Sequence, residues 1–162
     1  MREGDALERL LVGPRATEAL ARALAPRLER GDVLALWGEL GVGKTSFARE
    51  LIAALTGERR VPSPTFTLVQ VYEGGPAPIW HFDLYRLKAP EDALELGLED
   101  ALAEAILLIE WPDRLGPLLP ADRLDLALAY ADAPDSRRVR LEGQGRWRAR
   151  LAAIAADLDM AT

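Results

Sequence analysis

The feature that most constrains this chain is the string Gly38-Glu39-Leu40-Gly41-Val42-Gly43-Lys44-Thr45. It fits the pattern of a phosphate-binding loop: a glycine, four residues, then glycine, lysine and threonine. A continuous apolar run at residues 33–37 precedes it, and a helical pattern from about Lys44 to Leu55 follows, closed by Gly57. A chance match in a chain of this composition has odds of roughly one in a thousand. The strand, loop and helix therefore predict an α/β fold that binds a nucleotide phosphate.

Each residue type in this loop has a chemical reason. Glycines let successive backbone N–H groups point inward and approach the phosphates, and the helix that follows adds its positive dipole end. Lys44 supplies a mobile charge for the β and γ phosphates, and the Thr45 hydroxyl is placed to ligate Mg²⁺. The residues expected to contact ATP or ADP are Glu39, Leu40, Gly41, Val42, Gly43, Lys44, Thr45 and Ser46.

A second apolar run, at residues 106–109, ends on the carboxylate of Glu110 and is stopped by Trp111-Pro112. Ligands of α/β sheets bind at the carboxyl ends of the strands, and a carboxylate there orients the metal or its water in phosphoryl transfer. We therefore expect Glu110 to complete a magnesium site with Thr45. Trp111 is either a cap on the core or a wall of the site.

The string His81-Phe82-Asp83-Leu84-Tyr85-Arg86 has the alternation of a strand, with His81, Asp83 and Tyr85 on one face. Such a face can bind metal, position water or receive a partner. It is alternatively a polar sheet face whose groups satisfy one another, with His81 a structural histidine. The string Ser63-Pro64-Thr65-Phe66 has the same two readings: a proline-stiffened loop, or a switch that senses the γ-phosphate through Ser63 and Thr65.

The apolar spacing elsewhere predicts a mixed sheet, parallel in the middle, with an antiparallel hairpin, antiparallel C-terminal strands and flanking helices. Further strands are expected at residues 8–12, 65–72, 79–84, 124–130 and 139–141. Helices are expected from Thr17 to Gly31-Asp32, at about residues 90–96, and from Trp147 to Leu158. A chain of 162 residues suits one domain spanning residues 1–162.

Composition excludes several classes of site. The chain has no cysteine and one histidine, so it holds neither a thiolate zinc site nor a multi-histidine metal site. A net charge of −6 opposes broad binding to a nucleic-acid backbone, and we expect no DNA partner. The arginines at residues 137–146 form either a solvated face or a small basic patch. The longest aliphatic stretch is too short to span a bilayer and the N-terminal residues lack a signal-peptide core, so a cytoplasmic protein without a membrane partner is expected.

The complete lack of asparagine bears on the base of the nucleotide. Guanine-specific P-loop GTPases usually read the base with an Asn-Lys-x-Asp segment, which this chain does not contain. Adenine is therefore favoured over guanine.

Taken together, these motifs resemble one family. The phosphate loop, the strings that begin at Ser63 and His81, and Ile109-Glu110-Trp111-Pro112 have the order and spacing of the bacterial TsaE (formerly YjeE) ATPases, over about residues 8–142. The resemblance implies a Mg²⁺-dependent ATPase of tRNA threonylcarbamoyladenosine biosynthesis that supports the TsaD and TsaB proteins and meets tRNA through them. It implies that Lys44 and Thr45 hold phosphate and magnesium, that Glu110 is the second magnesium ligand, and that Asp83 contributes to hydrolysis.

Two other functions stay open at this point. A small-metabolite P-loop kinase has the same loop but needs a substrate-binding lid, and no arginine-rich insertion follows Ile109. A nucleotide-binding assembly factor would bind ATP with no meaningful turnover. No clear internal arginine finger is found either. Arg86 is the nearest candidate, and it alternatively faces a partner.

Overall fold

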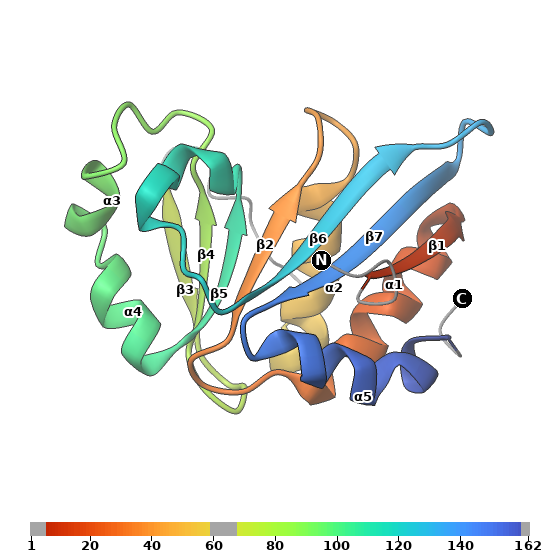
Figure 1. Ribbon diagram of the computed structural model, residues 1–162, viewed down its shortest axis with the longest axis horizontal. Helices are drawn as coiled ribbons and strands as arrows, with labels where there is room; N and C mark the ends of the chain where they lie inside the picture. The colour runs from red at the N-terminus through yellow and green to blue at the C-terminus, as the bar shows by residue number, and fades with distance from the viewer. Residues whose placement is uncertain (1–5, 59–67, 160–162) are drawn as a thin grey trace.

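The structure, a computed structural model, describes residues 6–58 and 68–159, and the strands of that part form one seven-stranded sheet in the order β1-β7-β6-β2-β5-β4-β3 (Figure 1). The strands are β1 (Ala6–Val12), β2 (Val33–Trp37), β3 (Val69–Tyr72), β4 (Ile79–Asp83), β5 (Ile106–Glu110), β6 (Arg123–Tyr130) and β7 (Ser136–Gln144). The four central strands β6, β2, β5 and β4 run parallel, whereas β3, β7 and β1 join antiparallel. The predicted α/β fold, parallel in the middle with antiparallel additions, is confirmed.

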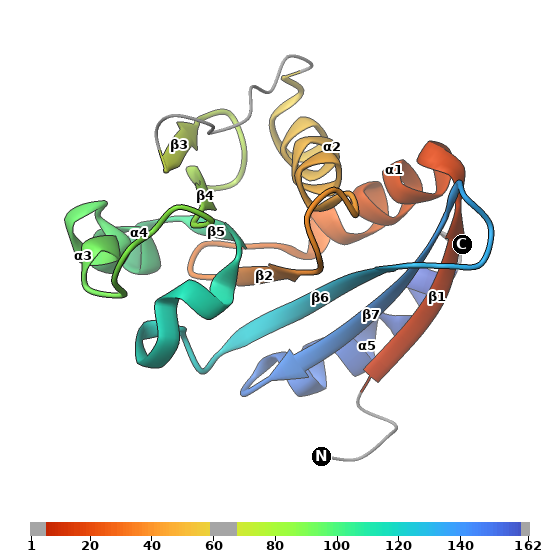
Figure 2. The ribbon, with the colours of Figure 1, turned by 90° about the horizontal axis from the view of Figure 1, so that it is seen from above.

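Helices cover the two faces of this sheet unequally. They are α1 (Gly13–Leu24), η2 (Ala25–Arg27), α2 (Lys44–Thr56), α3 (Asp92–Glu95), α4 (Leu98–Glu104), η3 (Pro112–Leu118) and α5 (Trp147–Asp159). Helices α1, α2 and α5 pack on one face, and α3, α4 and η3 pack on the other face over β4, β5 and β2 (Figure 2). Because β5 is covered on both faces, all five of its residues are buried, which is why it reads as a continuous apolar run.

The first helix differs from its predicted bounds. It begins at Gly13 rather than Thr17, because Pro14 suits the first turn, where a backbone N–H has no helical partner. It ends at Leu24 rather than at Gly31-Asp32, because Pro26 cannot continue an α-helix and the chain passes into the short η2. Of the predicted apolar stripe, Leu20 and Leu24 lie on α1 and are buried; Leu28 is also buried, but it lies after η2 in an extended conformation.

Two further elements depart from the prediction. Strand β3 starts at Val69, and residues 65–67 of the expected strand lie outside the described residues. The polar helical segment expected at about residues 90–96 forms only the short α3, and α4 was not predicted. Gly97 has a left-handed conformation and precedes α4, whose Leu98 and Ala101 are buried. No helix in the described residues has the length and apolar character needed to cross a membrane.

The parallel strands bring the chemistry to one edge. Strand β2 lies between β6 and β5, and β4 follows β5, so their carboxyl ends meet at the same end of the sheet. The phosphate loop leaves β2 there, Glu110 is the last residue of β5, and Asp83 is its partner at the end of β4.

Candidate active site

The phosphate loop joins β2 to α2, and its glycines are required by the backbone. Gly38 has φ +141°, and a Cβ there would lie 2.6 Å from the Leu128 carbonyl oxygen and 2.8 Å from Val42 Cγ1. Gly43 has φ +120° in the residue before α2. A side chain at either position would strain the turn or push it off β6, so the loop conformation depends on glycine.

Lys44 lies at the centre of the loop and is buried. Its ammonium group donates to the Gly38 carbonyl oxygen and stands 3.4 Å from the centre of the Trp111 ring. Burial lowers the pKa of Lys44, while the carboxylates of Glu110 and Asp83 act against that fall. A cation held by one carbonyl and a ring face has donors left for an incoming phosphate.

Glu110 is the junction between the loop and the strands. Its Oε1 accepts a hydrogen bond from the Thr45 hydroxyl at 2.7 Å, and its Oε2 lies 2.7 Å from His81 Nε2. Both His81 and Glu110 are almost fully buried. The predicted pair Thr45 and Glu110 is therefore in direct contact, although 65 positions separate the two residues in the chain.

Asp83 stands beside this pair and is half-buried. Its Oδ1 accepts the Tyr85 backbone N–H at 3.2 Å. Burial raises the pKa of the Asp83 carboxyl; the Tyr85 hydrogen bond opposes that rise, and the Glu110 charge adds to it. A carboxyl group whose proton affinity is raised beside a phosphate loop has the character of a group that handles a proton or a water.

Trp111 has both of its expected roles, as a cap on the core and as a wall of the site. Its backbone has φ +59°, the one positive value among the described residues other than glycine, and this turn carries the chain from β5 into η3. The ring packs partly against the core on that side and also lies under the Lys44 ammonium, with the Tyr85 ring 4.9 Å away. It is a wall of the site as well as a cover for the core.

These groups line a cleft of about 430 Å³. The lining residues are Leu40, Gly41, Gly43, Lys44, Thr45, Ser46, Leu68, Asp83, Tyr85, Arg86, Glu110 and Trp111. Tyr85 and Arg86 are exposed at its mouth. The structure thus brings together most of the site residues expected from the sequence.

Some expected residues lie elsewhere. Val42 turns its side chain into the core, and the exposed Glu39 does not line the cleft. His81 is a buried group behind Glu110 rather than part of a switch or partner surface. Ser63 and Thr65 lie outside the described residues.

A second hollow, of about 270 Å³, borders the other side of the loop. Gly43 and Ser46 line both hollows, so the second one continues from the first around the start of α2. Its other lining residues are Leu11, Gly13, Pro14, Thr17, Val42, Glu50, Leu128, Asp135 and Arg137.

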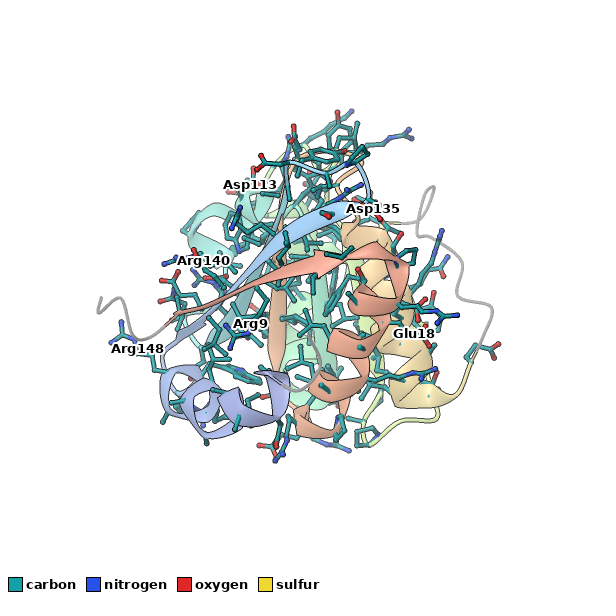
Figure 3. The ribbon with its side chains drawn as sticks, turned by 90° about the vertical axis from the view of Figure 1, so that its right-hand side faces the viewer. Arg9, Glu18, Asp113, Asp135, Arg140 and Arg148 are labelled. Carbon is teal, nitrogen blue, oxygen red and sulfur yellow. The ribbon has the colours of Figure 1, made fainter. Side chains whose placement is uncertain are left out.

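Arg137 is a residue that sequence reasoning missed. Its Nε donates to the Val42 carbonyl oxygen at 2.9 Å, and its guanidinium lies 4.6 Å from the centre of the Tyr130 ring. It thereby ties β7 to the phosphate loop. The neighbouring arginines show no such link: Arg138 is exposed, and Arg140 bonds Glu8 on β1 at 2.8 Å, on the solvated face (Figure 3). The alternation of β7 places Arg137 on the same face as the buried Val139 and Leu141, and Arg138 and Arg140 on the other face, so this alternation was the signal that could have found it.

The donor set at Thr45 and Glu110 suits Mg²⁺. A hydroxyl and a carboxylate are hard oxygen ligands, and Mg²⁺ is usually held by one or two protein oxygens together with substrate phosphates and water. The Glu110 oxygen next to Thr45 is thus the group that would hold the ion beside the loop.

Comparisons with known proteins agree on one family. The family model described as threonylcarbamoyl adenosine biosynthesis protein TsaE matches residues 11–139. The tRNA threonylcarbamoyladenosine biosynthesis protein TsaE of Rickettsia bellii is 44% identical over 124 residues, which cover 76% of this chain and 85% of that protein. The protein of the same description from Bacillus subtilis is 35% identical over 135 residues, covering 83% and 84%.

A solved structure shares the fold. The crystal structure of Bacillus subtilis YdiB superposes with a TM-score of 0.77 and 29% sequence identity, covering 96% of this chain and 95% of that one.

Proposed function

The chain belongs to the TsaE family of threonylcarbamoyl adenosine biosynthesis proteins, and from this membership and the cleft we propose that it is a Mg²⁺-dependent ATPase of tRNA threonylcarbamoyladenosine biosynthesis. The observation that carries the proposal is the contact between Thr45 on the phosphate loop and Glu110 at the tip of β5. It joins the two halves of a nucleotide–metal site that are far apart in sequence.

The two hollows suggest how ATP lies. The phosphates occupy the cleft over the N-terminus of α2, where backbone N–H groups and Lys44 meet them. The adenosine extends past Gly43 and Ser46 into the second hollow, where apolar side chains such as Leu11 and Pro14 offer a surface for the base.

The residues of the cleft have different roles in hydrolysis. Lys44 leaves Gly38 and Trp111 to bind the β and γ phosphates, and Thr45 and Glu110 hold the metal. Mg²⁺, when bound, neutralises charge on the phosphate oxygens. Asp83, whose carboxyl keeps a raised pKa beside the γ-phosphate position, orients the attacking water.

Turnover depends on partners. Tyr85 and Arg86 are exposed at the mouth of the cleft, where a partner can reorient Arg86 or add a cation of its own. The family resemblance makes TsaD and TsaB these partners, with tRNA met through them. Hydrolysis is supported over metabolite phosphorylation because η3, which follows Glu110, packs Leu115 into the core and forms no lid.

The test is phosphate release from ATP by the purified protein, alone and with TsaD and TsaB. We expect slow release alone, a change of rate with the partners, and loss of release in Asp83→Asn. Complex formation should also differ between ADP and a non-hydrolysable ATP analogue; by linkage, the nucleotide that tightens the complex binds more tightly within it. GTP should bind clearly less well than ATP. Identical assembly in both nucleotides, with full multi-turnover tRNA modification when this protein is omitted, would contradict the proposal.

A further inference from the structure

His81 is a buried polar residue that follows an aliphatic stretch of the sheet, and its register partners are Leu108 on β5 and Gln70 on β3. On the sheet face toward α2, β4 and β5 present Ile79, Ile106 and Leu108 to the core. His81 pairs with Leu108 in register and is fully buried there. A buried imidazole costs stability unless both ring nitrogens find partners. The core does not require this imidazole, so His81 is a candidate for a functional role.

The two nitrogens of the His81 ring differ in their contacts. His81 Nε2 lies 2.7 Å from Glu110 Oε2, and Nδ1 is buried with no hydrogen-bond partner within residues 6–58 and 68–159. A carboxylate oxygen only accepts, so Nε2 carries the hydrogen of this bond and donates the hydrogen bond to Glu110.

This bond acts on Glu110 and not on the ligand. Glu110 has two carboxylate oxygens: Thr45 donates to one of them and His81 donates to the other. With Oε2 held inside the core, rotation of the carboxylate is blocked and Oε1 stays beside the Thr45 hydroxyl. Without His81, Lys44 is a competing charge, because its ammonium attracts the Glu110 carboxylate. The carboxylate would then be free to turn toward that cation and away from Thr45.

We propose that His81 is a positioning residue of the metal site, which fixes the rotation of the Glu110 carboxylate so that one oxygen is presented beside Thr45. The inference rests on the proposed function, because it assigns Glu110 to the metal. Hydrogen bonds to metal-binding carboxylates from outside the ligand set typically change metal affinity by about 10- to 100-fold. His81 is not itself a ligand, since its bonded nitrogen faces Glu110 and its ring is enclosed.

The experiment compares two polar replacements that differ in reach. The glutamine amide nitrogen of His81→Gln falls near the former Nε2, whereas the shorter asparagine of His81→Asn places its amide near the former Nδ1, out of reach of Glu110. Mn²⁺ binding to the ADP complex, measured by electron paramagnetic resonance, should weaken about tenfold or more in His81→Asn and stay within about threefold of wild type in His81→Gln. ADP binding without metal should be the same in all three proteins.

The control is Phe82→Leu, a buried change on the opposite face of β4, which lowers the melting temperature without touching Glu110. It should bind Mn²⁺ like the wild type. A merely structural histidine would make both His81 variants unstable and leave Mn²⁺ binding to the folded protein unchanged, which would overturn the inference. A wild type that binds ADP without any effect of Mn²⁺ would overturn the proposed metal site itself, and the two failures are distinct.

Discussion

The two ends of strand β2 show how differently this chain treats its buried charges. At the amino end, Asp32 accepts two hydrogen bonds from the Arg150 guanidinium on α5 and a third from the Glu29 backbone N–H. Arg150 also donates to the Arg27 carbonyl oxygen and stacks 3.8 Å from the centre of the Trp147 ring. This cluster is closed on itself and pins α5 to the start of the strand.

At the carboxyl end, the polar groups are held in place but keep hydrogen-bonding capacity that is not used. Lys44 rests on a carbonyl oxygen and a ring face, and His81 leaves Nδ1 without a partner among the described residues. Trp111 keeps a left-handed backbone that costs about 1–3 kcal/mol. The Asp32 end is built for stability, and the loop end retains unpaired capacity and strain for a ligand to use. Changes at the two ends should therefore have opposite signatures.

The largest effect is expected for Asp83→Asn on turnover at the loop end. Losing a carboxylate that orients water should lower ATP hydrolysis with partners by about 100-fold or more, while ATP affinity stays within about threefold, because the group acts mainly in the transition state. Phosphate release and calorimetry measure the two quantities. Asp122→Asn is the matched control, since Asp122 is exposed and bonds Arg146, away from the cleft. Unchanged hydrolysis in Asp83→Asn would return Asp83 to a structural role.

The next effect lies at the other end, in Asp32→Ala. Removing the carboxylate leaves Arg150 uncompensated at a partly buried place, and we expect the free energy of unfolding to fall by about 2–4 kcal/mol. The melting temperature should fall by about 5–15 °C. ATP affinity of the folded protein should stay the same. If Asp32→Ala weakens ATP binding as strongly as it destabilises the fold, the two ends of β2 are not independent.

Lys44→Ala should produce the reverse signature. It removes a charged donor from the phosphates and should weaken ATP binding by about 1.5–3 kcal/mol, with little change in the melting temperature of the ligand-free protein. Lys88→Ala is the matched control, because Lys88 is the one other lysine and is exposed. Calorimetry that finds the same ATP affinity in Lys44→Ala and Lys88→Ala would remove Lys44 from the site.

The contrast between the two ends of β2 also explains which features could be predicted from the sequence. The loop, β5 and β4 were predictable because each forms a continuous pattern in the sequence, and Glu110 because ligands bind at the carboxyl ends of parallel strands. The expected contact between Thr45 and Glu110 followed from that rule. Asp83 was expected at the site from the family resemblance.

The remainder depends on tertiary contacts that carry no local signal. Arg137 bonds the Val42 carbonyl oxygen across 95 positions, and Arg150 reaches Asp32 across 118. The alternation of β7 gives the face on which Arg137 lies, but neither segment indicates which distant group its arginine contacts. The direction in which the His81 ring points, toward Glu110 and away from solvent, also depends on α2 covering that face of the sheet.

The smallest expected effect is on the pH dependence of the melting temperature, which tests the cost of burying the Asp83 carboxylate at the loop end. Burial raises the pKa of Asp83 in the folded protein, so its ionised form is less favourable there than in the unfolded chain. The ionised carboxylate therefore costs stability at pH values above the folded pKa, and that cost disappears as the pH falls below the unfolded pKa, where both states are protonated. Asp83→Asn removes the cost, so in EDTA its melting temperature should exceed that of wild type slightly at pH 8, with the difference shrinking as the pH falls and vanishing below the ordinary aspartate pKa of 3.8. Asp122→Asn should behave oppositely, since the pKa of Asp122 is lowered by the Arg146 backbone N–H and its ionised form is favoured in the fold. A melting temperature of Asp83→Asn below wild type at pH 8 would mean that the ionised carboxylate stabilises the ligand-free cleft, and the loop end would then be as closed on itself as the Asp32 end.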